Sequence, residues 1–278
     1  ATRRFVPSLF SATDRLLPAG TEEYIVTNNT GETVERTLVV TQPNYCGMTL
    51  TRSRPQEQDW TFEGKLAAEG QVHTAFKRGN VVGVEMSVRG SDDEKIVIAV
   101  PELIDGKKVT VAVQEAYNLR KYNADLALNE DGSAFHHTNA IEEGNEYGAA
   151  VLVKVTLEPG ESVAVPVTRV LDFTTQKYKD GVTFERPYVR EFAGTADGRV
   201  RAQAIGERAL NNYTEWESRT VRIQEAILAA VKVNPAYRNN EKEALRKARL
   251  ILNELSYLLA NASVATYDDK KRLVARFL

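Results

Sequence analysis

The sequence of 278 residues contains a single cysteine, Cys46. One thiol cannot form an intrachain disulfide or a cysteine-rich zinc site. No basic residue is identifiable as the partner that would make Cys46 a nucleophile, so we expect a small, partly buried side chain. A chain without disulfides fits a reducing compartment, and the expected location is cytoplasmic.

Excess charge and long apolar runs are also lacking. Basic residues number 36 and acidic residues 38, which leaves a net charge of −2. This balance does not create the positive field typical of nucleic-acid binding, so no nucleic-acid partner is expected. No run approaches the roughly 20 apolar residues of a membrane-spanning helix. We therefore expect no transmembrane segment.

Histidine is scarce, with three in the chain, and this limits metal chemistry. His136 and His137 are adjacent, and neighbouring side chains on an extended segment point to opposite faces, so they are poor co-ligands. His73 is distant from them in sequence. The glycines form no phosphate-binding loop, and no Gly-x-Ser-x-Gly elbow supports a serine nucleophile. The sequence therefore predicts no metal site and no cofactor.

Alternating apolar residues are the main pattern of the first two thirds of the chain. Two such runs flank the turn at residues 158–161 (Glu-Pro-Gly-Glu), which predicts a β-hairpin. Runs over residues 21–28 and 34–40 flank an Asn-Asn-Thr-Gly turn and predict a second hairpin. Further strands are expected at residues 72–77, 82–88, 95–100 and 109–113, the last two joined by a turn at Asp105-Gly106.

About eight short strands with no helices between them favour an antiparallel β-sandwich, because parallel strands need crossover connections. We place this sandwich domain at residues 1–195. Residues 42–70 are expected to form a long loop that tucks Trp60 and Phe62 onto the sandwich. Residues 115–147 are expected to form a second long, polar loop.

Beyond Gly198 the apolar period becomes helical and predicts a long helix that breaks at residues 233–235. A second helix is expected at about residues 241–260, and the tail from residue 268 is expected to begin another. The fold class is thus mainly β, an antiparallel β-sandwich followed by a C-terminal α-helical arm at residues 196–278. The stripe of the first helix consists of Ile205, Ala209, Trp216, Ile223 and Ile227.

Among the acidic residues, Asp172 is the first candidate for a functional role, because it lies at a strand end between two apolar residues, where burial would perturb its pKa. The alternative is a carboxylate that accepts hydrogen bonds from loop backbone. Sugar-binding surfaces use exposed aromatic rings, and the alternative for such rings is packing at the sandwich edge. The aromatic candidates in expected loops are Trp60, Tyr117, Tyr122 and Tyr178.

Several short motifs follow one another in a characteristic order. They are the turn at residues 157–161, Leu171-Asp172-Phe173, Tyr188 with Phe192, the helical run at 213–217, and Asn253-Glu254-Leu255. Phe5-Val6-Pro7, Leu17-Pro18 and Asn28-Asn29-Thr30 precede them. Over nearly the whole chain, this order and spacing resemble glycoside hydrolase family 116, the β-glucosidase family that includes the non-lysosomal glucosylceramidases.

The resemblance implies an N-terminal β-sandwich, a linker helix and a catalytic barrel of paired helices that carries a Glu nucleophile and an Asp acid/base. The motifs of this chain match the sandwich and linker, so the resemblance assigns no catalytic residue to it. Two motifs depart from the family pattern: Leu171 stands where Trp is usual, and Ala262-Ser263-Val264 replaces Gly-Gly-Thr.

The expected function is that of a non-catalytic sandwich-and-linker portion or subunit of a β-glucosidase-like glycoside hydrolase in carbohydrate metabolism. Its partner would be a helical catalytic domain or subunit. One alternative is a stand-alone assembly protein that self-associates through the helical arm or a strand edge. Another is a carbohydrate-binding module with exposed aromatic rings on one sheet face. The first hypothesis predicts an apolar outer patch on the helices.

Overall fold

The computed structural model describes residues 2–5, 14, 16–47, 49–52, 60–63, 70–118, 147–177, 183–192, 201–237, 239–240, 242–251, 266–267 and 273–274. The chain divides into two compact units. Unit 1 consists of Ala1–Arg4, Ala19–Phe173 and Asp197–Leu210. Unit 2 consists of Phe5–Pro18, Thr174–Ala196 and Asn211–Leu278.

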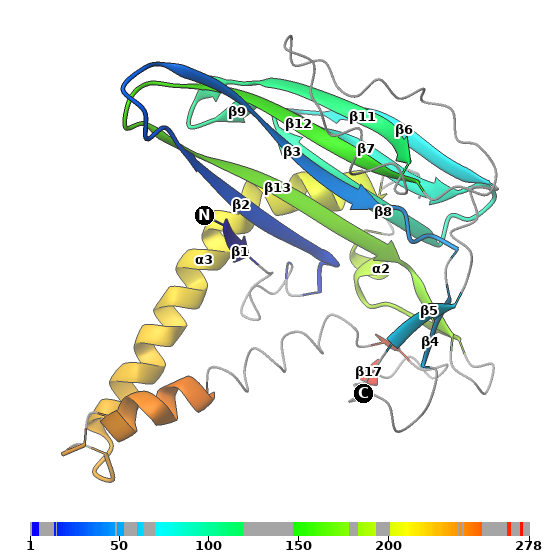
Figure 1. Ribbon diagram of the computed structural model, residues 1–278. Coiled ribbons are helices and arrows are strands. Elements are labelled where there is room, and N and C mark those ends of the chain that lie inside the picture. The colour runs from blue at the N-terminus through cyan, green and yellow to red at the C-terminus, as the bar shows by residue number, and fades with distance from the viewer. Residues whose placement is uncertain are drawn as a thin grey trace. The chain divides into compact units, whose positions relative to one another are not determined.

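A six-stranded sheet in the order β1-β2-β13-β8-β7-β6 forms one layer of unit 1 (Figure 1). The pairings from β2 through to β6 are antiparallel. The strands are β1 (Thr2–Phe5), β2 (Ala19–Thr27), β6 (Gln71–Arg78), β7 (Val81–Val88), β8 (Glu94–Pro101) and β13 (Ser162–Phe173).

A three-stranded antiparallel sheet in the order β11-β12-β3 forms the other layer. Its strands are β3 (Val34–Pro43), β11 (Thr110–Asn118) and β12 (Tyr147–Leu157). In register, Val151 of β12 lies between Val40 and Val113. Since alternate residues of a strand share a face, this register places the odd-numbered valines of β12 on one side.

The hydrophobic core lies between the two sheets, because both contribute side chains to one buried cluster. The three-stranded sheet supplies Val40, Ala149, Val151, Val153, Val155 and Leu157, and the six-stranded sheet supplies Val84, Met86, Ile96, Ile98, Val165 and Val167. The period-2 patterns of the sequence thus place one face of each strand in a common interior. The predicted antiparallel β-sandwich is confirmed.

The two predicted hairpins are wrong, because each turn carries the chain from one sheet to the other. β12 pairs with β3 and β11, whereas β13 pairs with β2 and β8. β2 and β3 are divided between the sheets in the same way. An alternating run with one buried face looks the same in either arrangement, so the local pattern could not identify its partner strand.

Asn28 connects these two turns. Its backbone N–H donates to the Glu161 carbonyl, and its own carbonyl accepts from the Gly160 N–H, both at 2.9 Å. Its side-chain amide donates to the carbonyls of Glu32 at 2.8 Å and Leu157 at 3.0 Å. Asn28 is buried, so these bonds satisfy backbone groups at the sandwich end that water would otherwise have to reach.

Two further strand pairs belong to unit 1. β4 (Thr49–Arg52) and β5 (Trp60–Glu63) are antiparallel, with Arg52 opposite Trp60, so the loop predicted for residues 42–70 is wrong at these strands. β9 (Leu103–Ile104) and β10 (Lys107–Lys108) flank Asp105-Gly106. Asp105 and Gly106 have φ values of 51° and 74°, so the predicted Asp-Gly turn is confirmed.

The long helix α3 (Arg201–Val233) begins on the six-stranded sheet, on the face opposite the core. A Cβ atom placed on Gly206 would lie 3.5 Å from Val97 Cγ1 and 3.6 Å from Val170 Cγ2, so the helix backbone runs close to β8 and β13. Ala202 and Ile205 are fully buried at this contact. The predicted long helix is confirmed, and so is its break, since α3 ends at Val233.

Unit 2 contains residues 211–233 of α3, and residues 242–251 form a second helix within the range predicted for it. The two helical segments pack through Val231, Ala244 and Ala248. Earlier in α3, the Trp216 indole N–H donates to the Asp14 carboxylate at 2.9 Å, and the Asn212 amide donates to the same oxygen at 3.0 Å. These bonds hold the segment around Asp14 against the helix.

Unit 2 also contains the short helix α2 (Tyr188–Glu191) and a small sheet. The sheet consists of β14 (Thr175–Lys177), β15 (Thr183–Glu185), β16 (Thr266–Tyr267) and β17 (Leu273–Val274). The helix predicted from residue 268 is therefore wrong at Leu273–Val274. Among the described helices, none combines the length and the apolar composition needed to cross a membrane.

Candidate functional site

Asp172, the first candidate from the sequence, lies in a group of charged side chains in unit 1, of which Asp172 and Lys95 are buried. It is fully buried on β13, directly opposite Lys95 of β8. The Arg201 guanidinium at the start of α3 donates from Nε to Asp172 Oδ2 at 3.0 Å and to Oδ1 at 3.2 Å. A cation is the sign that a helix N-terminus disfavours. The position of Arg201 is therefore explained by its carboxylate partner.

Two more acidic side chains approach Lys95. Lys95 Nζ lies 3.9 Å from Glu85 Oε1 and 4.0 Å from Asp92 Oδ1. Burial raises the pKa of the Glu85 carboxyl, while the Lys95 charge and a hydrogen bond with Gln203 act in the opposite direction. Among the residues that the structure describes, none forms a hydrogen bond with Glu85 Oε2. The ion cluster, defined as Glu85, Asp92, Lys95, Asp172 and Arg201, thus joins β7, β8, β13 and α3.

This ion cluster can hold a helix in place. Buried ion pairs repay much of their desolvation cost only when their partners are fixed in position, so they favour one arrangement of the elements that carry them. Here the partners come from β13 and from α3, 29 residues apart in sequence. Sequence analysis found Asp172 but missed Glu85, Lys95 and Arg201. For Glu85 and Lys95 the signal was a charged side chain within a strand rich in apolar residues.

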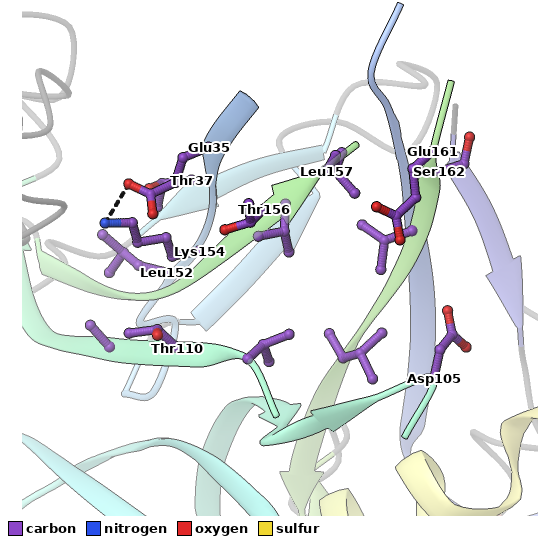
Figure 2. Close-up of a pocket in the computed structure, with 15 residues that line it drawn as sticks. Glu35, Thr37, Asp105, Thr110, Leu152, Lys154, Thr156, Leu157, Glu161 and Ser162 are labelled. Carbon is purple, nitrogen blue, oxygen red and sulfur yellow. Dashed lines mark ion pairs between the residues drawn. The ribbon is translucent and has the colours of Figure 1, made fainter. Parts of the chain in front are cut away.

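A separate cleft of about 400 Å³ opens in unit 1 alongside β12 (Figure 2). At one end Lys154 Nζ pairs with Glu35 Oε1 at 2.5 Å. Asp105 and Glu161 both lie toward the other end of the cleft, as Figure 2 shows. The remaining lining is Thr37, Ile104, Val109, Thr110, Ala112, Leu152, Val155, Thr156, Leu157, Ser162 and Val163. The ion cluster around Asp172 does not contribute to this cleft.

Each of the three cleft carboxylates has a structural explanation. Glu35 pairs with Lys154. Asp105 lies on the exposed β9–β10 turn. The Glu161 carboxylate accepts the Glu158 backbone N–H at 2.9 Å. A glycosidase needs one carboxyl group held protonated by a dry environment near a second, ionised one. The exposed turn position of Asp105 and the ion pair of Glu35 do not provide such an environment.

The aromatic candidates cannot be assembled into a sugar-binding face from the described residues. The backbone of Trp60 is in β5 and that of Tyr117 is in β11, opposite Gly148. The side chains of these two residues lie outside the described residues, as do Tyr122 and Tyr178 as a whole. These four positions stay predictions.

Cys46 is buried and His73 is half-buried, and the surroundings of both favour their neutral forms. Burial raises the pKa of the Cys46 thiol to about 12, and the nearby carboxylates of Glu94 and Asp172 act in the same direction. Burial lowers the pKa of His73. His73 Nδ1 lies 2.5 Å from the Glu115 carbonyl, and Nε2 lies 3.1 Å from the Asn44 amide nitrogen.

The contacts of His73 define its protonation state. A carbonyl oxygen can only accept, so Nδ1 carries the proton, and the Asn44 amide then donates to Nε2. The neutral ring thereby connects β6 in one sheet to β11 in the other. Within the described part of the chain, no three His, Cys, Asp or Glu side chains are placed to hold a metal ion.

The fold and these sites together define a large antiparallel β-sandwich with the start of a long helix packed on the outer face of one sheet. Residues 12–216, about three quarters of the chain, match the family model described as "beta-glucosidase 2, glycosyl-hydrolase family 116 N-term". The chain therefore belongs to glycosyl-hydrolase family 116 and contains its N-terminal domain. The resemblance noted in the sequence is confirmed. No curated protein matches the chain.

Proposed function

We propose that this chain is a non-catalytic sandwich-and-linker portion of a β-glucosidase-like glycoside hydrolase, and that it supports a helical catalytic domain or subunit. The observation that carries the proposal is the ion pair between Asp172 and Arg201, which fixes the start of α3 on the sandwich. Because the start of the helix is fixed on the sandwich, a domain that binds the rest of the helix would be held in a defined position relative to the sandwich. In this proposal the sandwich comprises residues 1–195 and the linker arm residues 196–278.

Exposed apolar side chains on the helices support a docking role. Val233 is 75% exposed, and Val221, Leu245 and Leu250 are also exposed. Wholly polar outer faces would have argued against a partner. Apolar side chains on a helix surface gain free energy when a second surface removes them from water, by about 25 cal/mol for each Å² buried.

The chemistry of glycoside cleavage would then belong to the partner. Hydrolysis of a glycosidic bond requires two carboxyl groups about 5 to 9.5 Å apart on opposite sides of that bond. In the proposed enzyme this pair lies in the helical domain, and the sandwich contributes position and stability. Asp172 acts as the anchor of the linker helix, and a cytoplasmic location is retained as part of the proposal.

An activity assay tests the absence of catalysis. The purified 278-residue chain is incubated with an aryl β-glucoside, and release of the aryl group is followed over hours. We expect no turnover above the uncatalysed rate. Hydrolysis that persists in the purified chain and disappears on replacement of cleft carboxylates would overturn the non-catalytic assignment.

A binding assay tests the docking role. The chain is co-expressed with a family 116 helical domain, and co-purification of the two is measured. Val233→Asp places a charge in the proposed contact and should reduce recovery of the partner about tenfold or more, as loss of an apolar interface anchor does. Glu225→Gln, an exposed change on the same helix, is the control. Equal recovery with both variants would contradict docking through this surface.

A second proposal is self-association through the same helical arm, because exposed apolar residues can equally meet a second copy of the chain. Size-exclusion chromatography with light scattering distinguishes the two. A monomer at all concentrations excludes self-association, whereas a dimer that Val233→Asp dissociates would favour it. A carbohydrate-binding role predicts a change in tryptophan fluorescence on titration with glucosides, and an unchanged spectrum would exclude it.

A further inference from the structure

The strand β12 has neighbours of unequal length. On one side it pairs with β3 as far as Leu157, which lies opposite Val34. On the other side its pairing with β11 reaches only Lys154, which lies opposite Thr110. Within the described part of the chain, residues 155–157 therefore have a strand partner on one side only. Such an edge presents backbone N–H and C=O groups that can pair with another strand.

The chain just before β11 turns away from this edge. The Val109 N–H donates to the Glu102 carbonyl at 3.0 Å, which holds the β9–β10 hairpin together instead of extending β11 along β12. The cleft of about 400 Å³ lies at this place, and its lining includes Val109 and Thr110 on one side and Val155, Thr156 and Leu157 on the other. The cleft is thus located where a longer β11 would continue.

The cleft walls combine apolar and hydroxyl-bearing side chains. Val155 and Leu157 belong to the sandwich core, whereas Thr110, Thr156 and Ser162 supply hydroxyl groups. None of the fifteen lining residues is aromatic. Sugars are usually held against aromatic rings, whereas small and β-branched side chains are typical neighbours of a paired strand. This lining favours an extended polypeptide over a sugar.

The charged groups that line the cleft indicate which side chains a bound peptide would carry. The lining contains three carboxylates, on Glu35, Asp105 and Glu161, and one ammonium group, on Lys154. Lys154 is paired with Glu35 at one end of the cleft. Figure 2 shows Asp105 and Glu161 toward the opposite end, away from this ion pair. A net negative cleft attracts cationic groups and repels acidic ones.

We propose that this cleft binds an extended peptide segment that carries lysine or arginine beside short apolar residues and that pairs as an added strand with Val155–Leu157 of β12. Main-chain hydrogen bonds to β12 supply the affinity, and the carboxylates of Asp105 and Glu161 select the basic residue. This site is separate from the helical surface described above, so it is independent of the proposed function.

The test measures binding of a fluorescein-labelled peptide, Lys-Val-Thr-Val-Lys, to the full 278-residue chain by fluorescence anisotropy. The matched control peptide, Lys-Val-Pro-Val-Lys, has the same charge but lacks the central N–H donor and cannot pair as a regular strand. We expect saturable binding of the first peptide and at least about fivefold weaker binding of the second, since its central residue cannot donate a strand hydrogen bond. Equal binding of both peptides would overturn strand pairing.

Variants locate the site. Asp105→Asn keeps a residue that tolerates the left-handed backbone of the turn, and Glu161→Gln keeps an oxygen that can accept the Glu158 N–H. Each should weaken peptide binding about threefold, as expected for loss of one exposed charge pair. Glu32→Gln removes an exposed carboxylate outside the cleft lining and should leave affinity unchanged. Affinity that is equal in all three variants would place binding elsewhere and reject the proposal.

Discussion

At the central strands of the six-stranded sheet, both faces carry buried side chains, but these are of different kinds. The inner face contributes Val84, Met86, Ile96 and Ile98 to the sandwich core. The outer face, one residue out of phase on the same strands, carries Glu85, Lys95 and Asp172 beneath the start of α3. Apolar side chains can be exchanged for others of similar total volume with little loss of stability. Charged side chains that are removed from water instead require specific partners of opposite charge. The inner face therefore supplies cohesion, and the outer face specifies where the helix lies.

The largest effect is expected on the outer face. Asp172→Ala leaves the Arg201 guanidinium, whose side chain is 11% exposed, without its carboxylate. Removing one partner of a buried ion pair, while the other partner stays buried, should lower the free energy of unfolding by about 3 to 5 kcal/mol. Guanidinium-chloride unfolding of the full chain measures this loss. Glu32→Ala, on an exposed turn, is the control, and similar losses for both variants would contradict the role of the ion cluster.

A slightly smaller loss is expected on the inner face. Ile98→Ala removes three buried carbon atoms from a fully buried side chain and should cost about 3 kcal/mol, because the surrounding core closes the cavity only in part. Ile98→Val should cost only about 1 kcal/mol. The same unfolding measurement separates the two variants. A loss for Ile98→Val as large as that for Ile98→Ala would show that the inner face, too, depends on one exact packing.

The junction between the sheets should be less sensitive than either face. Asn28→Ala removes the side-chain bonds to the carbonyls of Glu32 and Leu157, and should cost about 2 kcal/mol, since buried carbonyls lose a donor. Asn29→Ala, an exposed change in the same turn, should be nearly neutral. Thermal unfolding compares them. Equal melting temperatures would mean that the backbone alone holds the two turns together.

The pH dependence of stability sharpens the comparison, because the outer face carries Glu85, a carboxyl group whose pKa is shifted by burial. Burial raises the folded-state pKa of Glu85 above its ordinary value of 4.5. At pH values between 4.5, the pKa of Glu85 in the unfolded chain, and its raised pKa in the folded chain, the folded state binds more protons than the unfolded state. The contribution of Glu85 to the free energy of unfolding therefore decreases as pH rises through this range. Glu85→Gln should remove that decrease in urea titrations above pH 4.5. An unchanged profile would show that Lys95 fully compensates the charge.

His73 should produce the smallest change, and with the opposite sign. Its folded-state pKa is lowered below 6.5 by burial, so the unfolded chain binds more protons as pH falls below that value. Stability contributed by the neutral ring is therefore present above pH 6.5 and is lost on acidification. The measurement compares the wild type with His73→Gln between pH 7.5 and 5. A parallel decline in both proteins would assign the acid sensitivity to other groups.

Much of the fold follows from local patterns that can be read in the sequence. The alternation from Val151 to Leu157 predicted a strand with one buried face, and the helical period from Ile205 to Ile227 predicted α3. The Asp105-Gly106 turn was likewise predicted, because only certain residues adopt positive φ easily. These features depend on neighbours within a few residues, so the sequence carries the information directly.

The errors concern contacts between distant residues. Two turns predicted as hairpins connect different sheets, since pairing depends on competition among all strands with similar patterns. β4 and β5 were predicted as loop because Pro55 and Gly64 lie near them, although their cross-strand pairs outweigh these local breaks. Sequence analysis selected Asp172 on local grounds but could not select Arg201, which lies 29 residues later.

The sequence by itself determined where most strands of the sandwich lie, where the long helix lies, and which face of these strands is apolar, because these properties arise from the period of the side chains along the backbone. Only the tertiary structure decided which strands pair, which charges meet beneath α3, and where β11 stops short of the end of β12. These outcomes depend on loop closure and on the sum of many long-range contacts, and no short stretch of residues encodes that sum.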